Sequence, residues 1–151
     1  MSKPSEPFMT PAGVPRDHQF LWLSLIGEAW RSLAVVAVDT NTSTWELASA
    51  LDKIAARYDL GSFKVIDAES PSTATGEALA EDLKSSVAQG VRTVAAVGWL
   101  LDGPRGFPLV EAAEAIVLLV RLGVSRAADV QAMAELVGRE RVLGCVTVRG
   151  A

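Results

Sequence analysis

Short apolar runs alternate with longer amphipathic segments along this chain, and this alternation constrains the fold more than any other feature. The runs are rich in Val, Ile and Leu and have the length of strands. Strands separated by helices of about 10–15 residues are typical of βαβ units. We therefore predict an α/β fold, with a doubly wound, mostly parallel sheet flanked by helices in three Rossmann-like layers. The predicted strands span residues 32–38, 63–67, 91–99, 115–122 and 141–148.

The segments between these runs carry helix start and stop signals. "STWE" from Ser43 is a capping box, which predicts a helix that continues until Gly61 ends it. Ser125 is the predicted cap of the last helix. Further helices are predicted over 75–90, 108–115 and 125–138, and residues 19–30 form either a first helix or, because the apolar run is continuous, a strand.

Length and composition predict a single domain with little material for a metal site. The chain has 151 residues, of which half are apolar. Four prolines lie within residues 1–18, so this segment is predicted to be an extended or mobile arm before a domain over 19–151. One cysteine, Cys145, and one histidine, His18, exclude a Cys-cluster metal site and leave little for a His-based site. No cofactor and no metal are expected.

Charge disfavours nucleic acid as a partner, and hydropathy argues against insertion into a membrane. The net charge of −4 disfavours nucleic acid. No apolar run approaches the roughly 18–20 residues of a membrane span, and the N-terminus lacks a signal-peptide core. We expect a cytoplasmic protein that does not insert into a membrane.

Three segments resemble a known superfamily. "RSLAVVAV" with the helix after it, "FKVIDAESP" and "AEAIVLLVRLGVSR" are similar to the ParA/MinD-type P-loop ATPases. The nearest branch is the cytoplasmic domain of the bacterial tyrosine kinases of capsule and exopolysaccharide assembly. The resemblance runs from about residue 19 to 148 and implies a nucleotide site at the carboxyl ends of the strands.

The phosphate loop implied by the resemblance is degenerate. The family loop ends in Gly-Lys-Ser/Thr, whereas here Asn41 and Thr42 stand where the glycine and lysine belong, and Ser43 and Thr44 retain the hydroxyls. A phosphate cradle needs glycines, so that successive amides point inward, and a lysine as a point charge. Each charge-assisted contact is worth about 1.5–3 kcal/mol, and Asp39 adds repulsion. Tight ATP binding by the family's route is not expected.

The acidic motifs implied by the resemblance are retained in part. The family's Val-Asp-Ala-Asp corresponds to "IDAE", so Asp67 and Glu69 either help to hold magnesium or end a strand and cap the following turn. The family's third motif, an acid that follows an apolar strand, can be aligned with this sequence in two registers. Either Asp102 is the retained acid, or the strand ends near Val97 and the acid is lost.

Other family positions are replaced. Val148 stands where the family has an adenine-contacting asparagine, and Tyr58 is the only tyrosine, so the tyrosine-rich tail of the kinases is absent. The arginines of the ring-assembly pattern correspond to Phe20 and Leu23.

The four tryptophans leave alternatives open. Trp45 and Trp99 either plug the emptied nucleotide pocket or pack as ordinary core. Phe20, Trp22 and Trp30 belong to the core or form a protein interface, where aromatic residues are enriched.

These features favour a non-catalytic pseudo-ATPase or pseudokinase domain. By resemblance, it acts as an interaction or regulatory subunit in bacterial surface-polysaccharide assembly, with a protein partner, a membrane polysaccharide copolymerase or a second copy. One alternative is a divergent nucleotide-binding ATPase or kinase that uses Ser43, Thr44, Asp67, with or without Asp102, and a lysine from elsewhere, such as Lys53 or Lys64. Another is a small-ligand module of flavodoxin-like topology.

Overall fold

The computed structural model describes residues 30–40, 42–57, 61–69, 75–102, 106–123 and 125–149. Five strands and four α-helices alternate along these residues, together with two single 3-10 turns. The strands are β1 (Ser32–Ala37), β2 (Phe63–Asp67), β3 (Arg92–Trp99), β4 (Ala115–Leu122) and β5 (Val142–Arg149). The helices are α2 (Trp45–Arg57), α3 (Gly76–Ala88), α4 (Gly106–Ala112) and α5 (Ala127–Val137), and the 3-10 turns are η1 (Leu100–Asp102) and η2 (Arg139–Arg141).

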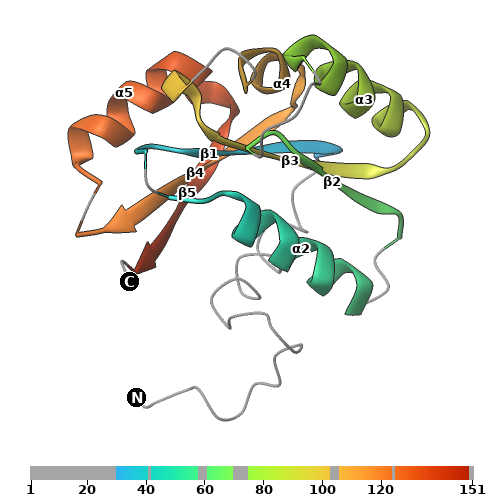
Figure 1. Ribbon diagram of the computed structural model, residues 1–151, viewed down its shortest axis with the longest axis horizontal. Helices are drawn as coiled ribbons and strands as arrows, with labels where there is room; N and C mark the ends of the chain where they lie inside the picture. The colour runs from blue at the N-terminus through green and yellow to red at the C-terminus, as the bar shows by residue number, and fades with distance from the viewer. Residues whose placement is uncertain are drawn as a thin grey trace.

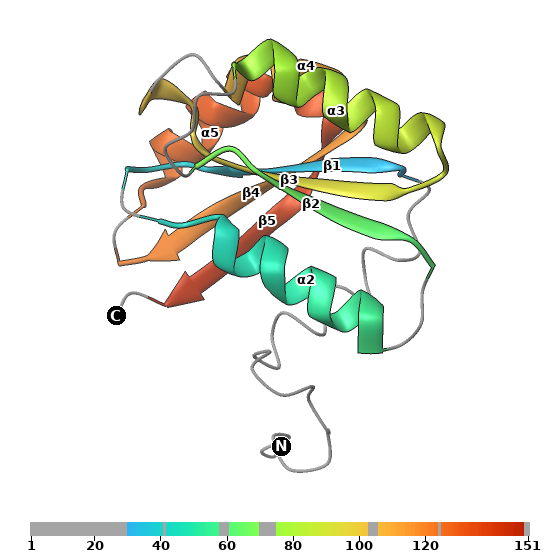
Figure 2. The same cartoon turned by 45° about the vertical axis from the view of Figure 1, so that its right-hand side comes forward.

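The strands form one parallel sheet in the order β2-β3-β1-β4-β5. Helix α2 covers one face, and α3, α4 and α5 cover the other (Figures 1 and 2). This division follows from handedness. The connection from β1 to β2 runs toward one edge of the sheet and the other three run toward the opposite edge, so right-handed crossovers place their helices on opposite faces. The predicted three-layer α/β fold is confirmed.

Each face of the sheet has its own apolar core, and β1 contributes to both. All six residues of β1 are buried. Leu33 and Val35 pack with α2, whereas Ala34 and Val36 pack with the helices on the other side. This alternation is the period of two that a strand imposes. A β-branched run buried on both faces is typical of a central parallel strand.

Two predicted helix starts are wrong by one residue. The amide of Ala48 donates to the carbonyl of Thr44 at 3.1 Å, so Thr44 rather than Ser43 is the N-cap of α2. The N-cap of α5 is Arg126, because the hydroxyl of Ser125 instead accepts from the amide of Arg121 at 2.9 Å. Both predicted capping hydroxyls also bond to another loop, Ser43 to Glu69 after β2 and Ser125 to Asp39 after β1.

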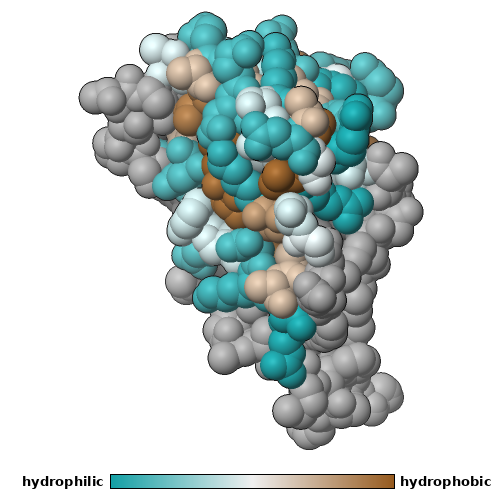
Figure 3. All heavy atoms as spheres, turned by 90° about the vertical axis from the view of Figure 1, so that its right-hand side faces the viewer, coloured by the Kyte–Doolittle hydropathy of each residue, from teal (hydrophilic) through white to brown (hydrophobic). Residues whose placement is uncertain are grey.

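The predicted arm over 1–18 and most of the predicted element over 19–30 lie outside the described residues. Within the described part of the chain, no helix has the length and apolar character needed to cross a bilayer. Figure 3 shows the side of the molecule that lies at the right of Figure 1. Hydrophilic side chains cover most of its described surface, with small apolar areas between them.

Candidate functional site

The candidate site lies where the carboxyl ends of the central strands meet. Strands β1 and β4 are neighbours, yet β1 leads to α2 on one face of the sheet and β4 leads to α5 on the other. Ligands of open α/β sheets bind at such a switch point. Around it lie the described loop residues 38–40 and 42–44 after β1, 68–69 after β2, and 123 and 125–126 after β4, together with the end of β3.

A carboxylate of the chain itself lies at the N-terminus of α2. Glu69 Oε2 accepts from both the amide and the hydroxyl of Thr44, each at 2.5 Å. Glu69 Oε1 accepts from the hydroxyl of Ser43 at 3.0 Å. Helix N-termini favour anions because their first amides have no intrahelical partner and the helix dipole is positive there. The two hydroxyls that the resemblance assigns to a phosphate site are therefore bonded to an internal anion.

Gly98 makes room for this carboxylate. Its amide donates to Thr44 Oγ1 at 2.9 Å, and Thr44 is completely buried. The φ angle of Gly98 is +78°, and an added Cβ would lie 3.1 Å from Glu69 Cγ. The β1–β3 register shifts at this point, so β3 carries an irregularity that directs the Gly98 amide toward α2. Gly98, Thr44 and Glu69 thus form a continuous chain of hydrogen bonds.

Asp67 shapes the turn that presents Glu69. Its Oδ1 accepts from the amide of Glu69 at 2.9 Å, a local bond of the kind that Asp side chains make two residues on. Asp67 thus ends β2 and bonds to the turn after it, whereas Glu69 bonds to the loop before α2. Among the described residues, no group of three or more His, Cys, Asp or Glu side chains is arranged to hold a metal ion.

Asp39 joins the loops on the two sides of the switch point. Its Oδ1 accepts from the Thr42 hydroxyl at 2.8 Å, and its Oδ2 accepts from the Ser125 hydroxyl. The bond from Ser125 to Asp39 joins the loop after β4 to the loop after β1, and Ser125 in turn accepts from the amide of Arg121 in β4. Asp39 therefore holds the degenerate loop in place.

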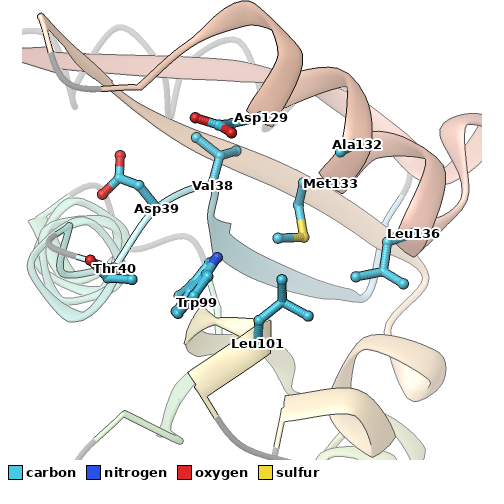
Figure 4. A pocket seen from close by; sticks show the side chains of 9 residues that line it. All are labelled: Val38, Asp39, Thr40, Trp99, Leu101, Asp129, Ala132, Met133 and Leu136. Atoms are coloured by element: carbon cyan, nitrogen blue, oxygen red, sulfur yellow. The ribbon is translucent and has the colours of Figure 1, made fainter.

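Beside this loop lies an open pocket of about 270 Å³ (Figure 4). Trp99 forms part of its wall, and Asp39 lies at its edge with Asp129 of α5. The pocket is lined by Val38, Asp39, Thr40, Trp99, Leu101, Asp129, Ala132, Met133 and Leu136.

The two tryptophans of the plug hypothesis have different surroundings. Trp45, at the start of α2, is 41% exposed, so it is covered in part and also reaches the surface. Trp99 borders the pocket beside the degenerate loop. The position next to the hydroxyls of the loop is taken by the Glu69 carboxylate.

The remaining predicted site residues are dispersed or lie outside the described residues. Asn41, Phe20 and Trp22 are outside them. Strand β3 continues through Trp99 rather than ending near Val97, and Asp102 is the last residue of η1.

Two further residues have partners within the chain. Trp30 was predicted to belong to the core or to an interface, and Lys64 was considered as a substitute lysine. Trp30 is only 4% exposed, and the guanidinium of Arg92 lies 4.2 Å from the centre of its ring. A ring so enclosed offers little area to a partner protein. Lys64 Nζ pairs with Asp82 at 2.7 Å, which holds its charge beside α3.

Sequence reasoning missed Glu69 as the anion at α2, and it missed Gly98, Ser125 and Asp129 as parts of the site. One signal was present. An isolated glycine within an apolar strand, as at Gly98, indicates a bulge or a close approach. For Glu69 the sequence offers no comparable signal, because the contact depends on which strands are neighbours.

The fold and the site define the chain as a three-layer α/β protein of Rossmann-like architecture with a carboxylate at its central helix N-terminus. The chain matches no protein-family model, and a comparison with curated proteins finds no significant relative.

Proposed function

We propose that this chain is a non-catalytic pseudo-ATPase domain that acts through protein contacts. The observation that carries the proposal is the carboxylate of Glu69 on the amide of Thr44 and on the hydroxyls of Thr44 and Ser43. In a P-loop protein the corresponding helix N-terminus binds phosphate. Here the same donors are engaged by an acid of the chain.

The charges around the loop also oppose a triphosphate. A phosphate that entered beside Glu69 would meet another anion, and two unit charges 4 Å apart repel by about 4 kcal/mol at an effective dielectric constant of about 20. Asp39 and Asp67 bond to the loop or to Glu69 and add to the negative charge. Lys64, one of the two lysines considered as a substitute, is paired with Asp82.

The resemblance of the sequence to the kinase branch of the ParA/MinD-type ATPases supports a setting. We infer a cytoplasmic interaction or regulatory subunit in bacterial surface-polysaccharide assembly. Its partner is a membrane polysaccharide copolymerase, an active relative or a second copy of the chain. A gene neighbourhood without polysaccharide functions would remove this setting and would leave the pseudo-ATPase proposal intact.

Isothermal titration calorimetry with Mg-ATP and Mg-ADP tests the proposal. We expect no binding below a dissociation constant of about 1 mM, which corresponds to a binding free energy weaker than about −4.1 kcal/mol. A micromolar constant would overturn the proposal. Mg-dependent ATP turnover that is lost in Asp67→Ala would instead favour the divergent nucleotide enzyme.

A further inference from the structure

We propose that the pocket beside the degenerate loop binds a segment of the partner protein that carries a basic side chain next to an apolar one. The inference rests on the proposed function, in that the domain acts through protein contacts, and it specifies the chemistry of the partner. The pocket lies between the ends of β1 and β3 and helix α5.

One side of the pocket suits a cation. Figure 4 shows the carboxylates of Asp39 and Asp129 on this side, and the indole of Trp99 lies in the wall between Thr40 and Leu101. A guanidinium or ammonium group is attracted both by carboxylates and by the face of a tryptophan ring. Arg is the better match because its planar fork pairs with carboxylates and also stacks on aromatic rings.

The opposite side of the pocket is apolar and extends to the surface. Met133 is buried at its base, whereas Leu101 and Leu136 are 62% and 49% exposed. Small-molecule sites enclose most of their ligand, and an open mouth with exposed leucines does not. Tryptophan and methionine are enriched where proteins meet. The shape therefore favours a protein segment over a small free amine.

One cation of the chain already lies near this pocket. Arg126 Nε is 3.7 Å from Asp129 Oδ2, and the Arg126 side chain is 83% exposed. Exposed ion pairs of this length contribute little to stability, so a partner cation competes with Arg126 at small cost. Asp129 Oδ2 also accepts from the amide of Arg126 at 3.2 Å, which fixes the carboxylate at the start of α5.

The test is a titration of the 151-residue chain labelled with ¹⁵N and with ¹³C at the methionine methyl groups. It follows the indole N–H resonance of Trp99 and the methyl resonance of Met133. Three probes are compared. They are the capped peptide acetyl-Leu-Arg-Leu-amide, the same peptide with neutral citrulline in place of arginine, and butylguanidinium. We expect saturable shifts with the arginine peptide, and about tenfold weaker binding of the other two, because each lacks either the charge or the apolar neighbours.

Variants on α5 locate the binding site. Asp129→Asn keeps the size and capping ability of the side chain and should weaken the arginine peptide about fivefold or more. Leu136→Ala, at an exposed position where the fold is not at risk, should also weaken it. Glu135→Gln removes the same charge from the same helix but outside the pocket, where Glu135 pairs with Arg139 at 3.3 Å, and should leave binding unchanged.

Three results would overturn the inference. The first is the absence of a saturable shift at Trp99 up to about 10 mM peptide. The second is equal binding of the arginine and citrulline peptides. The third is binding of butylguanidinium as tight as that of the peptide, which would assign the pocket to a small cation. Failure of the proposed function is separate from these, because micromolar Mg-ATP binding would be seen by calorimetry whatever the peptides do.

Discussion

Gly98 is the residue whose identity the site constrains most tightly. Its φ of +78° is disfavoured for residues with a Cβ, and the space beyond its Cα is taken by the Glu69 side chain. The Gly98 amide also donates to the buried hydroxyl of Thr44. A side chain at position 98 would therefore have two effects: it would strain the backbone, and it would displace the Glu69 carboxylate from the N-terminus of α2.

Gly98→Ala should lower the free energy of unfolding by about 1–3 kcal/mol, since it combines a strained φ with a close contact. The matched control is Gly144→Ala on β5, where the backbone has no positive φ and an added Cβ meets nothing within 4 Å. We expect the control to change stability by less than about 0.5 kcal/mol. Urea denaturation measures both variants, and equal effects would contradict the account of Gly98.

Single residues of the site were the hardest to predict. The sequence indicates hydroxyls at Ser43 and Thr44 and acids at Asp67 and Glu69, and the structure places all four together. The sequence does not indicate that the Glu69 side chain reaches across the end of β3 to the N-terminus of α2. That contact joins residues 25 apart and requires β3 to lie between β2 and β1.

At the scale of elements, the N-terminus of α2 is an anion site that the chain occupies itself. Glu69→Ala should vacate it and leave the Thr44 amide and the hydroxyls of Ser43 and Thr44 without their acceptor. The loss of a helix cap typically costs about 0.5–2 kcal/mol. An anion from solution then has donors to bind.

We predict that inorganic phosphate stabilises Glu69→Ala but not the unaltered protein. With about 20 mM phosphate and a dissociation constant of about 5 mM, linkage gives about 1 kcal/mol, which corresponds to a rise in melting temperature of about 2–4 °C. Chloride at matched ionic strength controls for screening. Glu46→Ala, which removes an acid from the first turn of the same helix, should behave like the unaltered protein. An equal rise in all three proteins would contradict the prediction.

A hydrogen-bonded ion pair connects Arg31, just before β1, with Glu114, just before β4. The carboxylate of Glu114 accepts from the amide of Arg31 at 2.7 Å and from its Nε at 2.8 Å. Bonding to Arg31 lowers the pKa of Glu114. A carboxyl whose pKa is lower in the folded state stabilises the fold above its unfolded pKa of about 4.3, and this contribution is lost as the pH falls through the lowered value.

Glu114→Gln should therefore destabilise the protein at about pH 7, and the difference from the unaltered protein should shrink toward about pH 3. The effect should be modest and should decrease with added salt, because the pair is exposed. Urea midpoints at several pH values measure it, with Glu81→Gln, in an exposed pair with Lys84, as the control. A difference that stays constant with pH would contradict the assignment.

At the scale of the whole molecule, the sequence predicts the positions of the strands and helices better than it predicts the order of the strands in the sheet. All five strands match the predicted runs to within one residue at each end, because the apolar runs are local and strong. Helix α4 begins two residues before the predicted segment, at Gly106, whose backbone packs so closely that an added Cβ would lie 2.6 Å from Val97.

The strand order depends on contacts between distant segments, which periodicity does not report. The flavodoxin-like order is 2-1-3-4-5, whereas here β3 lies between β2 and β1. The flavodoxin-like alternative is therefore wrong in topology. The observed order is also what allows Glu69, after β2, to pass the end of β3 at Gly98 and reach α2.

The most direct test of the central claim follows the backbone amide of Thr44 by NMR while Mg-ATP is added to the 151-residue chain. Because this amide donates to Glu69, we predict that its resonance does not shift in a saturable way up to about 1 mM Mg-ATP. A saturable shift of the Thr44 resonance at micromolar Mg-ATP would contradict the claim, since the nucleotide would then have displaced the carboxylate.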